Sequence, residues 1–188
     1  IKNKLLFLKI SGFDNFELQV DSYWYNKQSD EVLRGNFNLL RPLFITAPFF
    51  SYLQALIKFI FSSYWMNVLE ILQILFSSIA GVFFYKLSTQ LFKEEQTSIL
   101  ATILFCFYPM TLWWVGTFAQ EIWFQSFLII FFYYFMKSLD ENSLRLLIIS
   151  AIVFSLTFLT KSHILLFSVF IPLIILLKKN LLFFNKLK

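Results

Sequence analysis

The sequence predicts an all-α polytopic membrane protein. Of its 188 residues, 59% are hydrophobic and only 14% are charged, whereas a soluble domain normally carries about 25% charged residues. The mean hydropathy is +0.70, and most basic residues bracket long apolar runs. These observations exclude an ordinary soluble domain, a disordered tail and a disulfide scaffold. The net charge of +5 does not indicate nucleic acid, because the basic residues form no solvated patch.

Five apolar runs have nearly the length that a membrane-spanning helix needs, about 20 residues. They cover residues 66–86, 98–117, 121–137, 144–160 and 163–178. The runs are continuous and do not alternate with polar residues, so we expect helices and not the strands of a barrel. The chain begins at Ile1 and ends just after an apolar stretch restarts. We therefore interpret residues 1–188 as a single, partial transmembrane domain of a longer protein.

Residues 11–62, which include the long polar stretch 11–42, predict an outer loop that carries two short helices. Residues 21–35 read as a surface helix, with Asp21 as the N-cap and Gly35 as the stop signal. Two pairs of opposite charge are spaced i,i+4 in it, Lys27 with Glu31 and Asp30 with Arg34. Residues 48–62 are short for a span and contain Lys58. We expect this segment to lie at the membrane interface with Lys58 snorkelling; a tilted span is the alternative.

The basic residues occur in alternate loops, which predicts the topology. They are Lys86 and Lys93, Lys137 and Arg145, and Lys178 and Lys179. If these loops are cytoplasmic, residues 11–62, 117–121 and 160–163 lie outside. We expect a multi-pass protein of the bacterial inner (plasma) membrane with its functional face outward.

The outer segments hold two candidate catalytic carboxylates. Asp21 could act as a general base towards an acceptor hydroxyl or amine, or it could be a plain helix cap. Glu121 opens an apolar run. It could line an outward-facing cavity, or simply occupy the favourable N-terminus of a helix.

The outer segments also hold cations that could bind a phosphate. Lys161 ends one apolar run, His163 starts the next, and Arg41 precedes Pro42. The alternatives are a snorkelling lysine, an interfacial histidine and a solvated loop arginine. Inside the first full span, Glu70 and Gln73 lie one turn apart, which favours interhelical hydrogen bonds.

The sequence contains no metal-ligand spacing and no other strong cofactor motif. The single cysteine, Cys106, has no thiol partner, and we expect it to be a small buried hydrophobe. The sequence therefore predicts no required cofactor. A divalent cation could still be shared by carboxylate oxygens, and the candidates for that role are Asp21, Asp30, Glu31 and Glu121.

Several residues and short segments follow one another in an order that resembles one protein family. They are Asp21 followed by Tyr25, Gly35 after a small helix, the helix led by Pro48, the basic loop of residues 93–105, Glu121 after an outer turn, and the turn Leu159-Thr160-Lys161. This order is similar to that of the GT-C class of integral-membrane glycosyltransferases that use polyprenyl-phosphate sugars. The branch it resembles contains the protein O-mannosyltransferases and the lipid A aminoarabinose transferase. The resemblance implies the N-terminal part of a GT-C transmembrane helix bundle, with an outer loop carrying interfacial helices.

The resemblance also implies a reaction and its residues. A sugar would pass, with inversion, from a polyprenyl phosphate to a lipid, glycan or protein acceptor on the outer face of the membrane. Asp21 would be the base and Glu121 a second catalytic carboxylate. The substrate-binding residues would be Tyr25, Arg41, Lys161 and His163, and the membrane lipids and the donor's tail would contact the Phe-rich helices. The alternatives are a transporter or lipid flippase with Glu70 on its path, and a non-catalytic membrane subunit.

Overall fold

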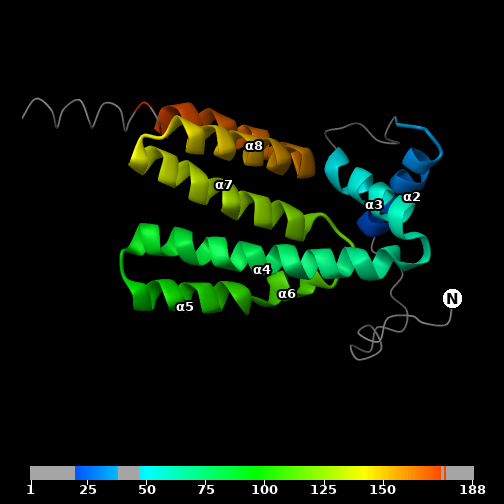
Figure 1. Cartoon of the computed structure of the whole chain (residues 1–188), viewed down its shortest axis with the longest axis horizontal. Helices are drawn as coiled ribbons and strands as arrows, with labels where there is room; N and C mark the ends of the chain where they lie inside the picture. The colour runs from blue at the N-terminus through cyan, green and yellow to red at the C-terminus, as the bar shows by residue number, and fades with distance from the viewer. Residues whose placement is uncertain (1–19, 38–46, 175, 177–188) are drawn as a thin grey trace, which may run out of the picture.

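The computed structural model describes residues 20–37, 47–174 and 176. These residues are helical or form connections between helices, and none of them is in a strand. The helices pack side by side into an elongated bundle, with two short helices at one end (Figure 1). The predicted all-α membrane fold is therefore confirmed.

The two short helices are α2 (Val20–Leu33) and α3 (Pro48–Phe61). Pro48 occupies the first turn of α3, where its missing N–H needs no partner. Gly35 has a φ of 85°, and its amide donates to the Val32 carbonyl at 3.0 Å, while the Asn36 amide donates to the Glu31 carbonyl at 3.0 Å. This pair of bonds is the Schellman ending, which requires a left-handed residue and so favours glycine. The stop predicted at Gly35 is confirmed.

Helix α3 buries one face and exposes an apolar one. Phe50, Ala55 and Ile57 are buried, whereas Phe59 is 77% exposed and Leu56 and Ile60 are also exposed. An exposed apolar stripe beside a packed face is what an interfacial helix needs. A short 3₁₀ turn, η1 (Ser62–Tyr64), joins α3 to α4, and the two helices run in different directions (Figure 1).

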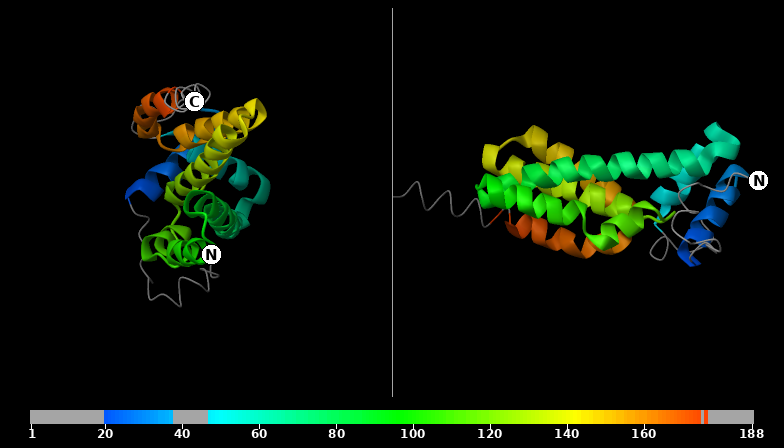
Figure 2. Two further views of the ribbon diagram at one scale, coloured as in Figure 1. Left: turned by 90° about the vertical axis from the view of Figure 1, so that its left-hand side faces the viewer. Right: turned by 90° about the horizontal axis from the view of Figure 1, so that it is seen from below.

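Helix α4 (Trp65–Phe92) runs along the bundle, with α5 (Glu95–Cys106) and α6 (Pro109–Val115) beside it (Figure 2, right). The axes of α5 and α6 differ by 50°. The predicted run 98–117 is thus a bent pair, because Pro109 lacks an N–H and cannot continue the preceding helix. Cys106, the last residue of α5, is exposed, so its predicted burial is wrong: its Sγ lies beside Gly81 of α4, which has no side chain that could cover it.

Helices α7 (Glu121–Glu141) and α8 (Leu144–Thr160) form an antiparallel pair, which is followed by the 3₁₀ helix η2 (Ser162–Val169). In the described part of the chain, two helical stretches, Pro48–Phe92 and Glu121–Glu141, are long and apolar enough to cross a membrane, and the α5–α6 pair would make a third. Leu144–Thr160 and Ser162–Ile174 are shorter apolar helices. The starts of the predicted runs agree with these helices to within a few residues, while five full spans stay a prediction.

A mainly apolar core joins the short helices to the bundle. Its buried members are Tyr25, Phe50, Ile57, Leu69, Ile122, Trp123 and Phe127. They come from α2, α3, α4 and α7, so the N-terminal helices are fixed to the bundle by packing. The core lies near the beginning of α7, which is one of the segments predicted to face outward.

The bundle has two distinct ends (Figure 1). The α2 end carries α2, α3, the turn before α7 and the turn after α8. The opposite end carries the α4–α5 and α7–α8 connections, with Lys93 and Arg145. The loops that the charge pattern assigns to one side of the membrane thus lie together at one end of the fold.

Candidate functional site at the α2 end

Two of the predicted site residues form an ion pair at the α2 end. The Lys161 Nζ lies 3.0 Å from the Glu121 Oε1, and each side chain is 21% exposed. Glu121 is the first residue of α7, where the helix dipole favours a negative charge. Lys161 follows the last residue of α8 and has extended backbone angles. The fold therefore joins two charges that are forty residues apart in sequence.

An aromatic ring lies beside both cationic candidates. The Lys161 Nζ is 5.6 Å from the centroid of the Phe124 ring, and the His163 ring lies 5.8 Å from the same ring. Phe124 is one turn along α7 from Glu121. The Phe124 ring limits the movement of the Lys161 side chain, whereas the side chain of His163 is exposed. Glu121, Phe124, Lys161 and His163 make up what we call the Glu121 cluster.

Gln73 fixes the turn that leads to the Glu121 cluster. It is fully buried, and its Nε2 donates to the Thr117 carbonyl at 2.7 Å. A side-chain amide from α4 thereby satisfies a backbone acceptor between α6 and α7. The predicted interhelical hydrogen bonding is confirmed for Gln73. Glu70, its neighbour on α4, is partly exposed and forms no ion pair with any residue in the described ranges.

Asp21 lies in the first turn of α2 and is exposed. Because α2 already includes Val20, Asp21 is inside the helix and not the residue that precedes it, so the predicted N-cap position is shifted. The carboxylate still lies at the favourable, positive end of the helix dipole. Its predicted role as a base stays a prediction.

Tyr25 and Arg41 are the remaining residues that the sequence predicts as substrate contacts. Tyr25 is 4% exposed, and its ring meets Phe50 edge-on with the ring centroids 5.2 Å apart. Its side chain is therefore part of the packing that holds α2 on α3. Arg41 lies outside the described residues.

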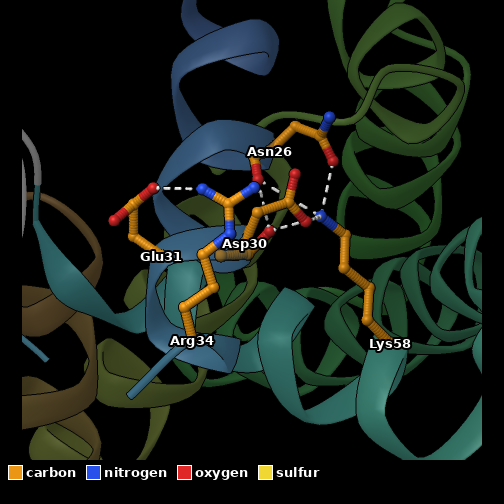
Figure 3. Close-up of polar contacts among 6 residues, drawn as sticks. Asn26, Asp30, Glu31, Arg34 and Lys58 are labelled. Atoms are coloured by element: carbon orange, nitrogen blue, oxygen red, sulfur yellow. Dashed lines mark hydrogen bonds and ion pairs between the residues drawn. The ribbon is translucent and has the colours of Figure 1, made fainter. Parts of the chain in front are cut away.

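Lys58 of α3 forms hydrogen bonds to three residues of α2 (Figure 3). Its Nζ donates to the Asn26 Oδ1, the Ser29 Oγ and the Asp30 Oδ1, each at 2.6 Å. The ammonium also lies 4.8 Å from the centroid of the Trp65 ring, and the side chain is only 9% exposed. The prediction that Lys58 snorkels into water is wrong, because α2 supplies the acceptors that water would otherwise provide.

The ion pairs of α2 also differ from those that the spacing predicts. Arg34 pairs with Glu31 at 2.9 Å, one turn back along the helix. Asp30 pairs with Lys58 at 2.6 Å. The predicted i,i+4 pairs of Lys27 with Glu31 and of Asp30 with Arg34 are therefore wrong. Asp30 forms its ion pair with Lys58 of α3, and Arg34 pairs with Glu31 instead.

Helices α2 and α3 also bury several polar side chains. Ser22, Gln28, Ser29, Ser51 and Gln54 are each at most 1% exposed. The Ser51 hydroxyl donates to the Gln28 Oε1 at 2.7 Å. The apolar spacing that indicates a spanning helix does not predict these buried polar residues.

Sequence reasoning also missed a signal for the Lys58 contact. Asn26, Ser29 and Asp30 have the spacing i, i+3, i+4, which places three acceptors on one face of α2.

The four carboxylates considered as ligands for a divalent cation do not gather. In the described ranges no three side chains of His, Cys, Asp or Glu come together as metal ligands. Asp30, Glu31 and Glu121 each face a cationic side chain of the protein instead. A divalent cation as cofactor stays a prediction.

The fold and the cluster define a helical membrane protein that gathers charged residues at one end. Residues 45–186 match the sequence profile of the dolichyl-phosphate-mannose-protein mannosyltransferase family. This match covers more than half of the chain, and the chain belongs to that family, within the GT-C class. It is thus a membrane glycosyltransferase of the mannosyltransferase type. No curated protein and no solved structure matches the chain significantly.

The matched region divides the predicted site residues. Glu121, Lys161 and His163 lie within residues 45–186, whereas Asp21, Tyr25 and Arg41 precede them. The family in general uses polyprenyl-phosphate sugars as donors. Glu121, Lys161 and His163 are therefore the predicted site residues that lie close together in the structure and also fall within the family match.

Proposed function

We propose that the protein transfers a sugar from a polyprenyl phosphate to a lipid, glycan or protein acceptor at the α2 end, on the outer face of the membrane. The observation that carries this proposal is the Glu121–Lys161 ion pair of 3.0 Å. It places a cation and a carboxylate at the end of the bundle that also carries Asp21, in a chain of this family.

In this proposal, Lys161 binds the donor phosphate. The lysine is partly exposed and has one carboxylate partner, so its ammonium has N–H groups left for a phosphate oxygen. A charge-assisted hydrogen bond stabilises the phosphate most as the sugar leaves and negative charge develops on it. His163, exposed and next to Phe124, would be a second contact.

Asp21 is the proposed base. The acceptor oxygen forms a bond to the anomeric carbon from the face opposite the phosphate. The bond between that carbon and the phosphate oxygen breaks, and its electron pair stays on the phosphate. The acceptor's proton passes to the Asp21 carboxylate. Exposure of Asp21 at the start of α2 leaves it accessible to an acceptor.

Donor kinetics test the role of Lys161. Membranes containing the protein would be assayed with a polyprenyl-phosphate sugar and an acceptor, at matched expression. Lys161→Met should lower kcat/KM by on the order of 10- to 100-fold, because a hydrogen bond to a charged group contributes about 1.5–3 kcal/mol. Lys161→Arg should retain most of the activity, and Lys93→Met, at the opposite end, should have none of this effect.

The partner variant separates phosphate binding from charge neutralisation. Glu121→Gln frees the ammonium of Lys161, so the apparent KM for the donor should stay the same or fall, whatever happens to kcat. If Lys161 serves only to neutralise Glu121, then Glu121→Gln/Lys161→Met should restore the donor KM that Lys161→Met raises. That restoration would contradict the phosphate role.

Labelling of single cysteines tests the proposed side of the membrane. A cysteine at Asn36 should react with a membrane-impermeant thiol reagent added from outside. Cysteines at Lys93 and Lys137 should react only after the membrane is opened, in a Cys106→Ala background. If positions 36 and 93 report the same side, residues 48–62 span the membrane and the topology is wrong.

A further inference from the structure

A groove at the opposite end of the bundle has charges that the proposed transfer reaction does not use. It lies between α4 and α7 and has a volume of about 430 Å³. Its lining includes Lys86 and Gln90 from α4, and Tyr133, Lys137, Asp140 and Glu141 from α7. Both signs of charge thus occur in one groove, at the end that the charge pattern assigns to the cytoplasm.

Two ammonium groups share one aromatic ring in this groove. The Nζ of Lys86 lies 6.0 Å from the centroid of the Tyr133 ring, and the Nζ of Lys137 lies 5.8 Å from it. The carboxylate nearest to Lys137 is that of Glu141, at the long distance of 3.7 Å. Lys86 has no ion pair within the described ranges. Both ammonium groups at this ring can donate to an anion that enters the groove.

The same groove also offers acceptors for a cation. The Gln90 Nε2 donates to the Asp140 Oδ2 at 2.6 Å, while the Gln90 Oε1 is buried and has no hydrogen-bond partner among the described residues. Both α4 and α7 end close by, at Phe92 and Glu141, and helix C-termini attract positive charge. The groove therefore has one part suited to an anion and another suited to an ammonium group.

We propose that this groove binds the head group of an aminophospholipid. The phosphate is bound by Lys86 and Lys137, and the primary ammonium is bound by the carboxylates of Asp140 and Glu141. The position supports a lipid as the source of the phosphate, because the groove lies at the ends of two apolar helices, where head groups meet a membrane protein. The site is independent of the transfer reaction proposed for the α2 end.

Native mass spectrometry of the purified protein in detergent tests this site. The protein would be mixed with phosphatidylethanolamine, phosphatidylglycerol or phosphatidylcholine that carry identical acyl chains. We expect phosphatidylethanolamine to bind about tenfold more tightly than the other two, which corresponds to about 1.4 kcal/mol. Lys86→Gln/Lys137→Gln should abolish the preference, and Asp140→Asn/Glu141→Gln should shift it to phosphatidylglycerol. The control, Lys93→Gln/Glu95→Gln, changes exposed charges at the same end and should leave the preference intact.

Two results would overturn the proposal. The first is equal binding of the three lipids, or a preference for phosphatidylethanolamine that survives Lys86→Gln/Lys137→Gln while the thermal stability of the variant is unchanged. The second is displacement of the lipid by millimolar inorganic phosphate, which would mean that the groove is a site for free phosphate. Lipid retention that glycerophosphoethanolamine reduces and inorganic phosphate does not would support a head-group site.

Discussion

Lys58 and Lys161, at the α2 end of the helix bundle, are held differently from Lys86 and Lys137 at the opposite end. At the α2 end, the side chain of Lys58 is 9% exposed and that of Lys161 is 21% exposed, and each lies within 3.0 Å of a carboxylate oxygen. At the opposite end, Lys137 is 38% exposed and 3.7 Å from its carboxylate, and Lys86 is exposed. Lys58 and Lys161 are thus held in position by nearby carboxylates, while Lys86 and Lys137 are left to interact with the surroundings.

This difference separates two uses of a lysine in a membrane protein. A cation that loses its water has to be compensated by fixed acceptors, and Lys58 has acceptors from three residues of α2. Such an arrangement is pre-organised, which is what stabilisation of a developing charge requires. The exposed lysines at the other end can follow a mobile partner such as a lipid head group.

Removal of Lys58 should have the largest effect on stability. Lys58→Met keeps the aliphatic chain but leaves the side chains of Asn26 and Ser29 without their donor, so the free energy of unfolding should fall by about 2–3 kcal/mol. Lys86→Met, the matched change at the opposite end, should cost less than about 0.5 kcal/mol. Reversible unfolding in mixed detergent micelles measures both. Equal losses would remove the contrast between the ends.

Neutralisation of Glu121 should have a smaller effect. Glu121→Gln removes the ion pair but keeps a hydrogen-bonding side chain next to Lys161, so we expect a loss of about 1–2 kcal/mol. Glu141→Gln breaks the 3.7 Å pair with Lys137 and should change stability by less than about 0.5 kcal/mol. The same unfolding assay applies. A larger loss for Glu141→Gln than for Glu121→Gln would reverse the proposed order.

Gln73→Leu should give the smallest loss of the three, about 1 kcal/mol, since hydrogen bonds between membrane helices contribute modestly. Its effect on activity should exceed its effect on stability, because the Thr117 carbonyl loses its donor and the turn before Glu121 is released. The donor KM and the unfolding energy, measured on one preparation, test this. Unchanged kinetics would show that the turn before Glu121 does not depend on the hydrogen bond from Gln73.

Apolar patterning predicts the long helices well, because spacing within one helix determines which residues can form it. Thus α8 begins and ends where the run 144–160 does, and α7 begins at Glu121 as predicted. The bend between α5 and α6 is a consequence of Pro109, whose position was visible but whose effect on direction depends on packing. The exposure of Cys106 depends on how α5 packs on α4, which the spacing within α5 does not determine.

The partners of the charged residues could not be predicted from spacing within one helix. Lys58 and Asp30 are 28 residues apart, and Lys161 pairs with Glu121 across two helices. Local rules instead favour an opposite charge at i,i+4, which for Asp30 would be Arg34. The grouping of the outer segments at one end was predictable, because alternate loops of a helical bundle lie on the same side.

Asp21→Asn is the most direct test of the central claim, that the α2 end carries out sugar transfer. Asparagine keeps the shape of the side chain, so the free energy of unfolding should change by less than about 1 kcal/mol. If Asp21 is the base, transfer from a polyprenyl-phosphate sugar should fall by roughly two to four orders of magnitude. Glu31→Gln, on the same helix, should leave transfer nearly unchanged. An Asp21→Asn variant that retains activity within a few-fold of the unsubstituted protein would contradict the claim and make Glu121 the next carboxylate to test.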